Sequence, residues 1–73
     1  MNQTETILHH LTHYGPITQA DAFELYGIFR LASRISDLKR FGFQVEKEMV
    51  TGKNRFGKTV SFARYSMKGD NNA

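Results

Sequence analysis

The fold is decided by residues 28–41, which read Ile28-Phe29-Arg30-Leu31-Ala32-Ser33-Arg34-Ile35-Ser36-Asp37-Leu38-Lys39-Arg40-Phe41. Apolar residues recur here at positions 28, 31, 35 and 38, which is the spacing of one face of an α-helix. The opposite face is polar and basic and carries Arg30, Ser33, Arg34, Asp37 and Arg40. We therefore predict a helix over this segment, closed by Gly42, with one buried side and one basic, hydroxyl-bearing side.

Two shorter helical patterns precede this segment. A helix is predicted over residues 4–14, because one of its faces collects Ile7, Leu8, Leu11 and Tyr14. After the extended Ile17, Thr18 and Asp21 have the spacing of a capping box, which predicts a second helix of about two turns. Gly27 lacks a Cβ and suits the left-handed end of that helix.

Beyond Gly42 the hydrophobic period changes to two, which predicts a strand over residues 43–50. A turn-rich, basic connection over residues 51–58 leads to a second strand over residues 59–67, so the pair forms a β-hairpin. The buried face of the second strand stays open, since residues 60 and 62 favour one parity and residues 63, 65 and 67 the other, with a bulge as one solution. We expect one domain, residues 1–67, and a flexible C-terminal tail, residues 68–73.

Length and composition exclude several classes of protein. A chain of 73 residues can form one small domain, with too little core to enclose a large active-site cleft. It has no Cys, which removes disulfides, thiol nucleophiles and Cys-based zinc sites. No apolar run approaches the roughly 20 residues of a membrane span, and the N-terminal residues lack the features of a signal peptide. We expect a cytoplasmic protein with no membrane partner.

The net charge of +3 is unevenly distributed. Residues 1–26 contain three acidic residues and no Lys or Arg, a charge of −3. Residues 27–73 hold all ten basic residues against four acidic ones, a charge of +6. Basic side chains gathered in one part of a chain are typical of a surface that faces a polyanion such as nucleic acid.

The apolar residues are interpreted as core. The set expected to be buried is Phe23, Leu25, Leu31, Ile35, Leu38, Phe41, Phe43 and Val45. Phe56, inside the basic connection, is expected to tuck under the hairpin rather than press on a sugar.

Catalytic and metal-binding patterns are weak. Glu5, His9 and His13 share a helical face, but solvated His residues explain them better than a metal site. Residues 52–59 match the spacing of a phosphate-binding P-loop, yet the following residues predict a strand where a P-loop requires a helix. We expect neither an enzyme nor a bound cofactor or metal.

Four motifs then carry a family resemblance over about residues 4–67: Ile17-Thr18, Leu25-Tyr26-Gly27-Ile28, the run from Arg30 to Leu38, and Phe41-Gly42-Phe43. With the order of elements, they resemble the small winged helix-turn-helix proteins of bacteriophages and prophages. The resemblance implies an α+β fold of three helices plus a C-terminal β-hairpin wing. It also implies binding of double-stranded DNA by a small transcriptional regulator or accessory DNA-binding factor.

The residues themselves indicate how such a domain would bind. The third helix would read base edges in the major groove through Arg30, Ser33 and Arg34. Asp37 would orient Arg34 or Arg30, the alternatives being a bond from cytosine N4 or simple solvation of the helix. The DNA backbone would be contacted by Thr18, Gln19, Arg40, Lys53, Asn54, Arg55 and Lys58. One module reads few base pairs, so a specific function favours a homodimer or a larger complex. The alternative is a protein-binding adaptor or inhibitor of a host protein, since a basic face also suits an acidic protein surface.

Overall fold

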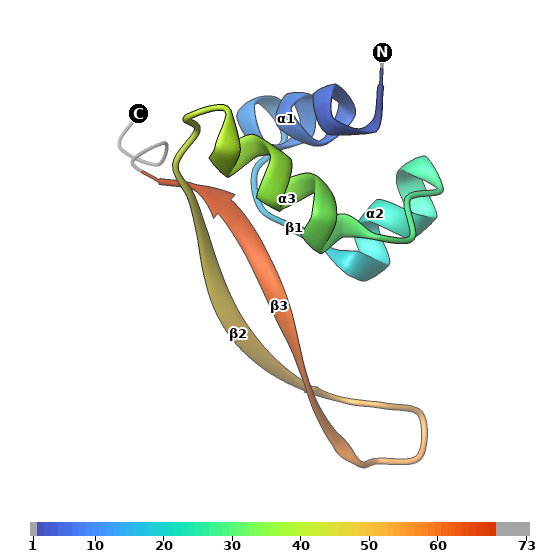
Figure 1. Cartoon of the computed structure of the whole chain (residues 1–73). Coiled ribbons are helices and arrows are strands. Elements are labelled where there is room, and N and C mark those ends of the chain that lie inside the picture. Colours follow the sequence, from blue (N-terminus) through green and yellow to red (C-terminus); the bar gives the residue numbers. More distant parts are fainter. Residues whose placement is uncertain (1, 69–73) are drawn as a thin grey trace.

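The computed structural model describes residues 2–68 of the chain (Figure 1). The elements follow in the order α1 (Gln3–His13), β1 (Ile17–Thr18), α2 (Gln19–Tyr26), α3 (Leu31–Arg40), β2 (Val45–Lys53) and β3 (Thr59–Met67). This order confirms the α+β class, with three helices followed by a hairpin. Of the expected tail, Lys68 donates its backbone N–H to the Gln44 carbonyl over 2.9 Å, and residues 69–73 lie outside the described residues.

Side chains cap the first two helices. At α2 the Asp21 N–H donates to Thr18 Oγ1 over 3.2 Å and the Thr18 N–H donates to Asp21 Oδ2 over 3.1 Å, which confirms the predicted capping box. Asn2 and Glu5 form the same arrangement at α1. Gly27 ends α2 in the left-handed conformation with φ 69°, as the sequence predicts.

The third helix starts three residues later than expected. Residues 28–30 form the turn between α2 and α3, because the Ile28 N–H donates back to the Ala22 carbonyl at the end of α2. Ile28 is nevertheless buried, so it anchors the turn to the core as the first residue of the predicted apolar stripe.

The core lies where the three helices meet the base of the hairpin. Its members are Ile7, Leu11, Ile17, Ala22, Ile28, Leu31, Ile35, Leu38 and Val45. The predicted stripe of α3 is therefore confirmed. Four of the expected core residues are wrong, since their exposed fractions reach 38–71%: Phe23, Leu25, Phe41 and Phe43. The short α2 buries Ala22 alone, and Leu38 is the last buried residue of α3.

The three strands form an antiparallel sheet in the order β1-β3-β2. The extended segment at Ile17 becomes a strand that pairs with Tyr65 of β3. The β2–β3 register runs without a bulge from the pair Val45–Met67 to the pair Lys53–Thr59. Tyr65 and Met67 are half-buried on the face of Val45, which settles the parity of β3 at its inner end.

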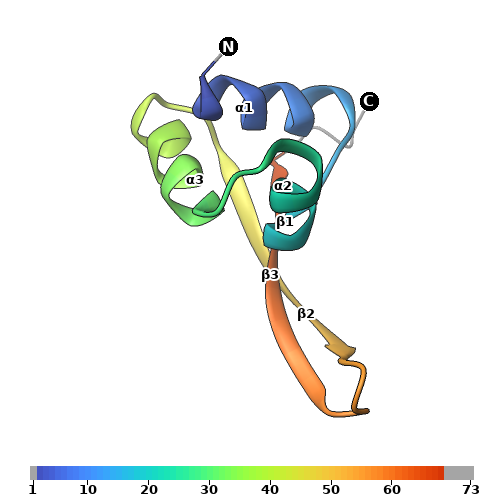
Figure 2. The same ribbon diagram turned by 90° about the vertical axis from the view of Figure 1, so that its right-hand side faces the viewer.

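The hairpin of β2 and β3, Val45–Met67, is called the wing from here on. It leaves the helices and projects away from them, as both Figure 1 and Figure 2 show. Val45 is the only buried residue of β2, so the rest of the wing is not covered by the helices. Both faces of its outer half are exposed, which explains why apolar residues occur there at both parities.

Candidate nucleic-acid interface

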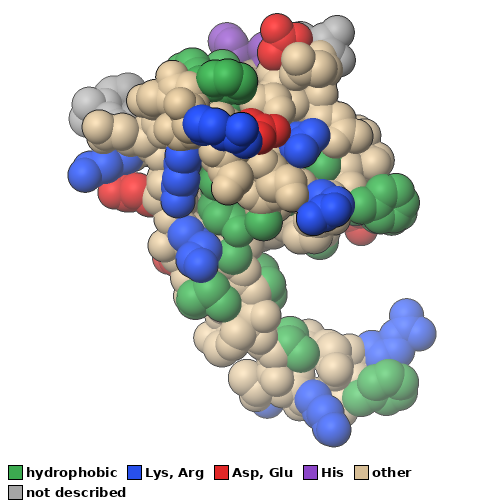
Figure 3. Space-filling view, in the orientation of Figure 1, with side chains coloured by type: hydrophobic (Ala, Val, Ile, Leu, Met, Phe, Trp, Pro, Cys, Tyr) green, Lys and Arg blue, Asp and Glu red, His purple; other side chains and the backbone are tan. Residues whose placement is uncertain are grey.

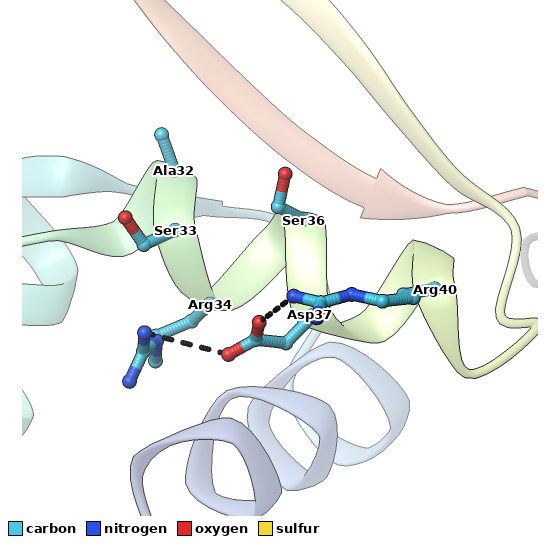
Figure 4. A pocket seen from close by; sticks show the side chains of 6 residues that line it. All are labelled: Ala32, Ser33, Arg34, Ser36, Asp37 and Arg40. Atoms are coloured by element: carbon cyan, nitrogen blue, oxygen red, sulfur yellow. Dashed lines mark hydrogen bonds and ion pairs between the residues drawn. The ribbon is translucent and has the colours of Figure 1, made fainter.

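The outer face of α3 is lined by small and polar side chains. Opposite the buried Leu31, Ile35 and Leu38, a surface depression of about 450 Å³ is bordered by Ala32, Ser33, Arg34, Ser36, Asp37 and Arg40 (Figure 4). Two of these, Ala32 and Ser36, are absent from the residues predicted to face outward. They could have been found from the helical period alone, because positions 32 and 36 lie away from the buried positions 31, 35 and 38 on a helical wheel.

Asp37 joins three partners beside this depression. Its carboxylate accepts a hydrogen bond from Arg40 Nη2 over 2.7 Å and lies 3.4 Å from Arg34 Nη2. Thr4 Oγ1 of α1 donates to the same carboxylate over 3.2 Å. Arg34 points to the side of α3 opposite Ala32 and Ser36 (Figure 4), and its side chain is 31% exposed. The expected pairing of Asp37 with an Arg is present, and it holds Arg34 at the edge of the face.

Arg30 lies just outside the helix on which it was expected. It is the N-cap residue of α3, is exposed, and its side chain makes no capping hydrogen bond. The ion pairs within residues 2–68 do not include it. Its guanidinium is therefore available at the N-terminal end of α3, the end that a helix in the major groove turns toward base edges.

Gln19 ties the turn together at the start of α2. Its Nε2 donates to the Ile28 carbonyl over 2.7 Å, and its Oε1 accepts the Leu31 N–H over 2.9 Å. Since Arg30 supplies no cap, Gln19 satisfies the first free N–H of α3. Thr18 is likewise used as the N-cap of α2. Thr18 and Gln19 remain candidates for contact with the DNA backbone, but each also has a structural role in the protein.

The wing tip, residues 53–58, is basic and exposed. Lys53, Arg55 and Lys58 lie here without an acidic neighbour in the tip. Asn54 Oδ1 accepts the backbone N–H groups of Phe56 over 2.9 Å and Lys58 over 3.1 Å, so the Asn54 side chain closes the loop. The loop directs Phe56 outward with 83% of its surface exposed, and the expectation that it plugs the hairpin is wrong. A two-stranded wing has no interior that could receive it.

Many basic side chains are visible on the same face of the molecule. Figure 3 shows Lys and Arg side chains over the helical end, along the wing and again at its tip. Arg64 is neutralised on the wing by Glu48, with 2.8 Å between Nη2 and Oε1. The uncompensated charge of the wing therefore concentrates at the tip.

His10, which is not part of the Glu5, His9 and His13 pattern, and the segment that matches a P-loop both have structural explanations. His10 is buried, with Nδ1 2.7 Å from the Tyr26 hydroxyl and Nε2 3.3 Å from the Pro16 carbonyl oxygen. Residues 52–59 run from β2 into β3, so the segment that matches a P-loop is a hairpin connection. Within residues 2–68, no group of three or more His, Asp and Glu side chains is arranged to hold a metal ion.

The described helices include none of the length and apolarity that crossing a membrane requires. No curated protein and no solved structure gives a significant match to the chain. A family model described as a winged helix-turn-helix domain matches residues 2–69, which agrees with the α2-turn-α3 unit and the hairpin that follows it. A domain of this kind indicates binding to double-stranded DNA. With nearly its whole length matched, the chain belongs to the winged helix-turn-helix domain family.

Proposed function

We propose that the protein binds double-stranded DNA with α3 in the major groove and the wing against the neighbouring backbone. Its role is that of a small transcriptional regulator or accessory DNA-binding factor of a phage or prophage, acting in the bacterial cytoplasm as a binding protein and not as an enzyme. The observation that carries this proposal is the placement of the basic residues, over α3 and at the wing tip on one face of the molecule (Figure 3).

The outer face of α3 suits close approach to base edges. Ala32, Ser33 and Ser36 are short side chains, so the helix backbone can lie deep in the groove. Arg30 at the start of the helix donates to guanine, and Ser33 donates to a base or a phosphate. Arg34 reaches the same groove from the edge of the face, oriented by Asp37.

The cations of the wing supply affinity more than specificity. Lys53, Arg55 and Lys58 neutralise phosphates and thereby release counterions from the duplex. Because one such module contacts few base pairs, we propose that site-specific binding uses two copies on adjacent half-sites.

The test is a titration of fluorescently labelled random duplex DNA, read by anisotropy at about 50 mM and about 200 mM salt. We expect binding with a Kd of micromolar order at the lower salt and a marked loss at the higher salt. Salt-independent binding, or no binding, would contradict the proposal and would support the adaptor or inhibitor of a host protein instead.

A further inference from the structure

The most exposed large apolar side chain at the tip of the wing has no role in the fold. Phe56 is 83% exposed, and no aromatic neighbour contacts its ring within the described residues. A Phe that contributes nothing to the core is costly to expose to water, because burying such a side chain is strongly favourable. Exposure alone does not imply a partner, but Phe56 is distinguished by lying in a loop that holds three cations and no acidic residue.

The chemistry around Phe56 indicates which surface would cover it. Arg55 precedes it and Lys53 and Lys58 lie at the two ends of the same loop, while the tip contains no acidic residue. An apolar ring among three cations suits a narrow groove with phosphates on both sides and apolar surfaces that can open between them. The minor groove of DNA provides both, because two phosphate chains flank it and the faces of the bases become accessible where a base step unstacks.

The backbone of the loop at Phe56 is held by hydrogen bonds before any partner binds. Asn54 Oδ1 accepts from the Phe56 and Lys58 N–H groups, and the Asn54 N–H donates to the Lys58 carbonyl over 3.0 Å. Gly57 takes φ 81°, a conformation that an L side chain rarely adopts, and its N–H donates to the Asn54 carbonyl. With the backbone fixed in this way, insertion has to order the Phe56 side chain but not the loop backbone.

The length of the wing is also sufficient. Nine residues of β2 at about 3.3 Å each span about 30 Å, and the buried end of the strand is Val45 alone. With α3 in a major groove, the next minor groove lies about 17 Å away along the duplex, which is half of a helical turn. The outer half of the wing therefore reaches it.

We propose that Phe56 is an apolar wedge that inserts between base pairs from the minor groove and bends the duplex at a flexible pyrimidine–purine step. This inference rests on the proposed DNA binding and adds a specificity determinant to it. The protein selects deformable steps at the position of the wing tip, in addition to the bases that α3 contacts.

The test compares two duplexes of about 30 base pairs carrying a donor and an acceptor dye at their ends, one of alternating T and A and one a stiff A-tract. Wild-type protein is expected to bend the alternating duplex, measured by energy transfer, and to bind it about tenfold more tightly than the A-tract. Phe56→Ala should abolish the bend and the preference while leaving the salt dependence of binding unchanged, since no charge is removed.

Two variants serve as controls. Phe56→Leu should retain the bend, because Leu also acts as a wedge between base steps. Phe41→Ala removes a ring that is 71% exposed at the end of α3, far from the wing tip in sequence, and should leave the bend unchanged.

The outcomes separate this inference from the proposed function. Equal bending and equal preference for wild type and Phe56→Ala would overturn the wedge while leaving DNA binding intact. Phe56-dependent binding to phosphatidylserine vesicles, without an effect on DNA, would also overturn it. If no duplex bound wild-type protein, both the wedge role of Phe56 and the proposed DNA binding would be overturned.

Discussion

At the residue scale, Asp37 restrains the basic face of α3. It holds Arg34 and Arg40 and accepts a hydrogen bond from Thr4 of α1. We predict that Asp37→Asn tightens binding to random duplex DNA severalfold at low salt, because it removes a negative charge beside the phosphates and releases two guanidinium groups. Stability should fall by no more than about 1 kcal/mol, since the pairs are partly exposed. Anisotropy titration and urea unfolding followed by circular dichroism measure the two effects.

The matched control is Glu24→Gln, which changes the net charge by the same amount on α2 away from these arginines. If the two variants gained equal affinity, the effect would be one of total charge and Asp37 would have no special position. A gain confined to Asp37→Asn would assign the restraint to the Arg34–Asp37–Arg40 cluster.

Gln19 also acts at the residue scale, but on the fold. Its amide bridges the Ile28 carbonyl and the Leu31 N–H, groups that lie nine and twelve residues along the chain. We predict that Gln19→Ala lowers the free energy of unfolding by about 1–3 kcal/mol, because both backbone groups lose their partner. Gln19→Glu should also be destabilising, since its carboxylate can still accept the Leu31 N–H but cannot donate to the Ile28 carbonyl. Urea unfolding measures the loss of stability. A Gln19→Ala variant that is as stable as wild type but binds DNA more weakly would instead show that Gln19 contacts the DNA backbone.

At the scale of elements, the sequence predicts features that depend on neighbouring residues, such as helical repeats and helix caps. The α3 stripe follows from the helical repeat, and the start and end of α2 follow from Thr18, Asp21 and Gly27. Long-range contacts escape this reasoning. Nothing in the local pattern indicates that Gln19 bonds across the turn, or that Phe23 and Phe41 are left exposed.

Some features of the candidate site can likewise be predicted from the sequence, and others cannot. The basic wing tip follows from charge and turn residues alone, and the structure places Lys53, Arg55 and Lys58 there. The contact of Thr4 of α1 with the carboxylate that pairs with Arg34 could not be predicted, because it depends on how α3 packs against α1. The sequence likewise cannot show that a two-stranded wing has no interior for Phe56.

The wing as an element is predicted to act through its unpaired cations. Arg55→Ala should weaken binding to all duplexes alike and lower the slope of log K against log salt by about one unit, because one phosphate contact is lost. Arg64→Ala is the matched control, since Arg64 lies on β3 of the same wing but is already neutralised by Glu48. Salt titrations of both variants provide the measurement. Equal changes in slope would mean that the position of the charge within the wing does not matter.

At the scale of the whole molecule, the residues that form the core are separate from the outer wing, which projects into solvent. Among residues 2–68, the buried apolar side chains lie in the helices, β1, the turn before α3 and the first residue of β2. The outer wing adds surface and charge without adding core residues. The molecule measures 39 Å along its longest axis and 27 and 20 Å along the other two. A domain built for stability alone has no use for such a projection, so its cost is consistent with a function in binding.

This division predicts the result of shortening the wing. Val50 and Phe62 face each other across the hairpin, so replacing residues 51–61 by Asn-Gly leaves that pair joined by a two-residue turn. The variant should keep its cooperative thermal unfolding, with Tm within a few degrees of wild type, because no core residue is removed. It loses Lys53, Arg55 and Lys58, so the salt slope of DNA binding should fall by about three units. A variant that unfolds would contradict the separation of core from wing, and one that folds and binds with the wild-type slope would show that α3 alone makes the phosphate contacts.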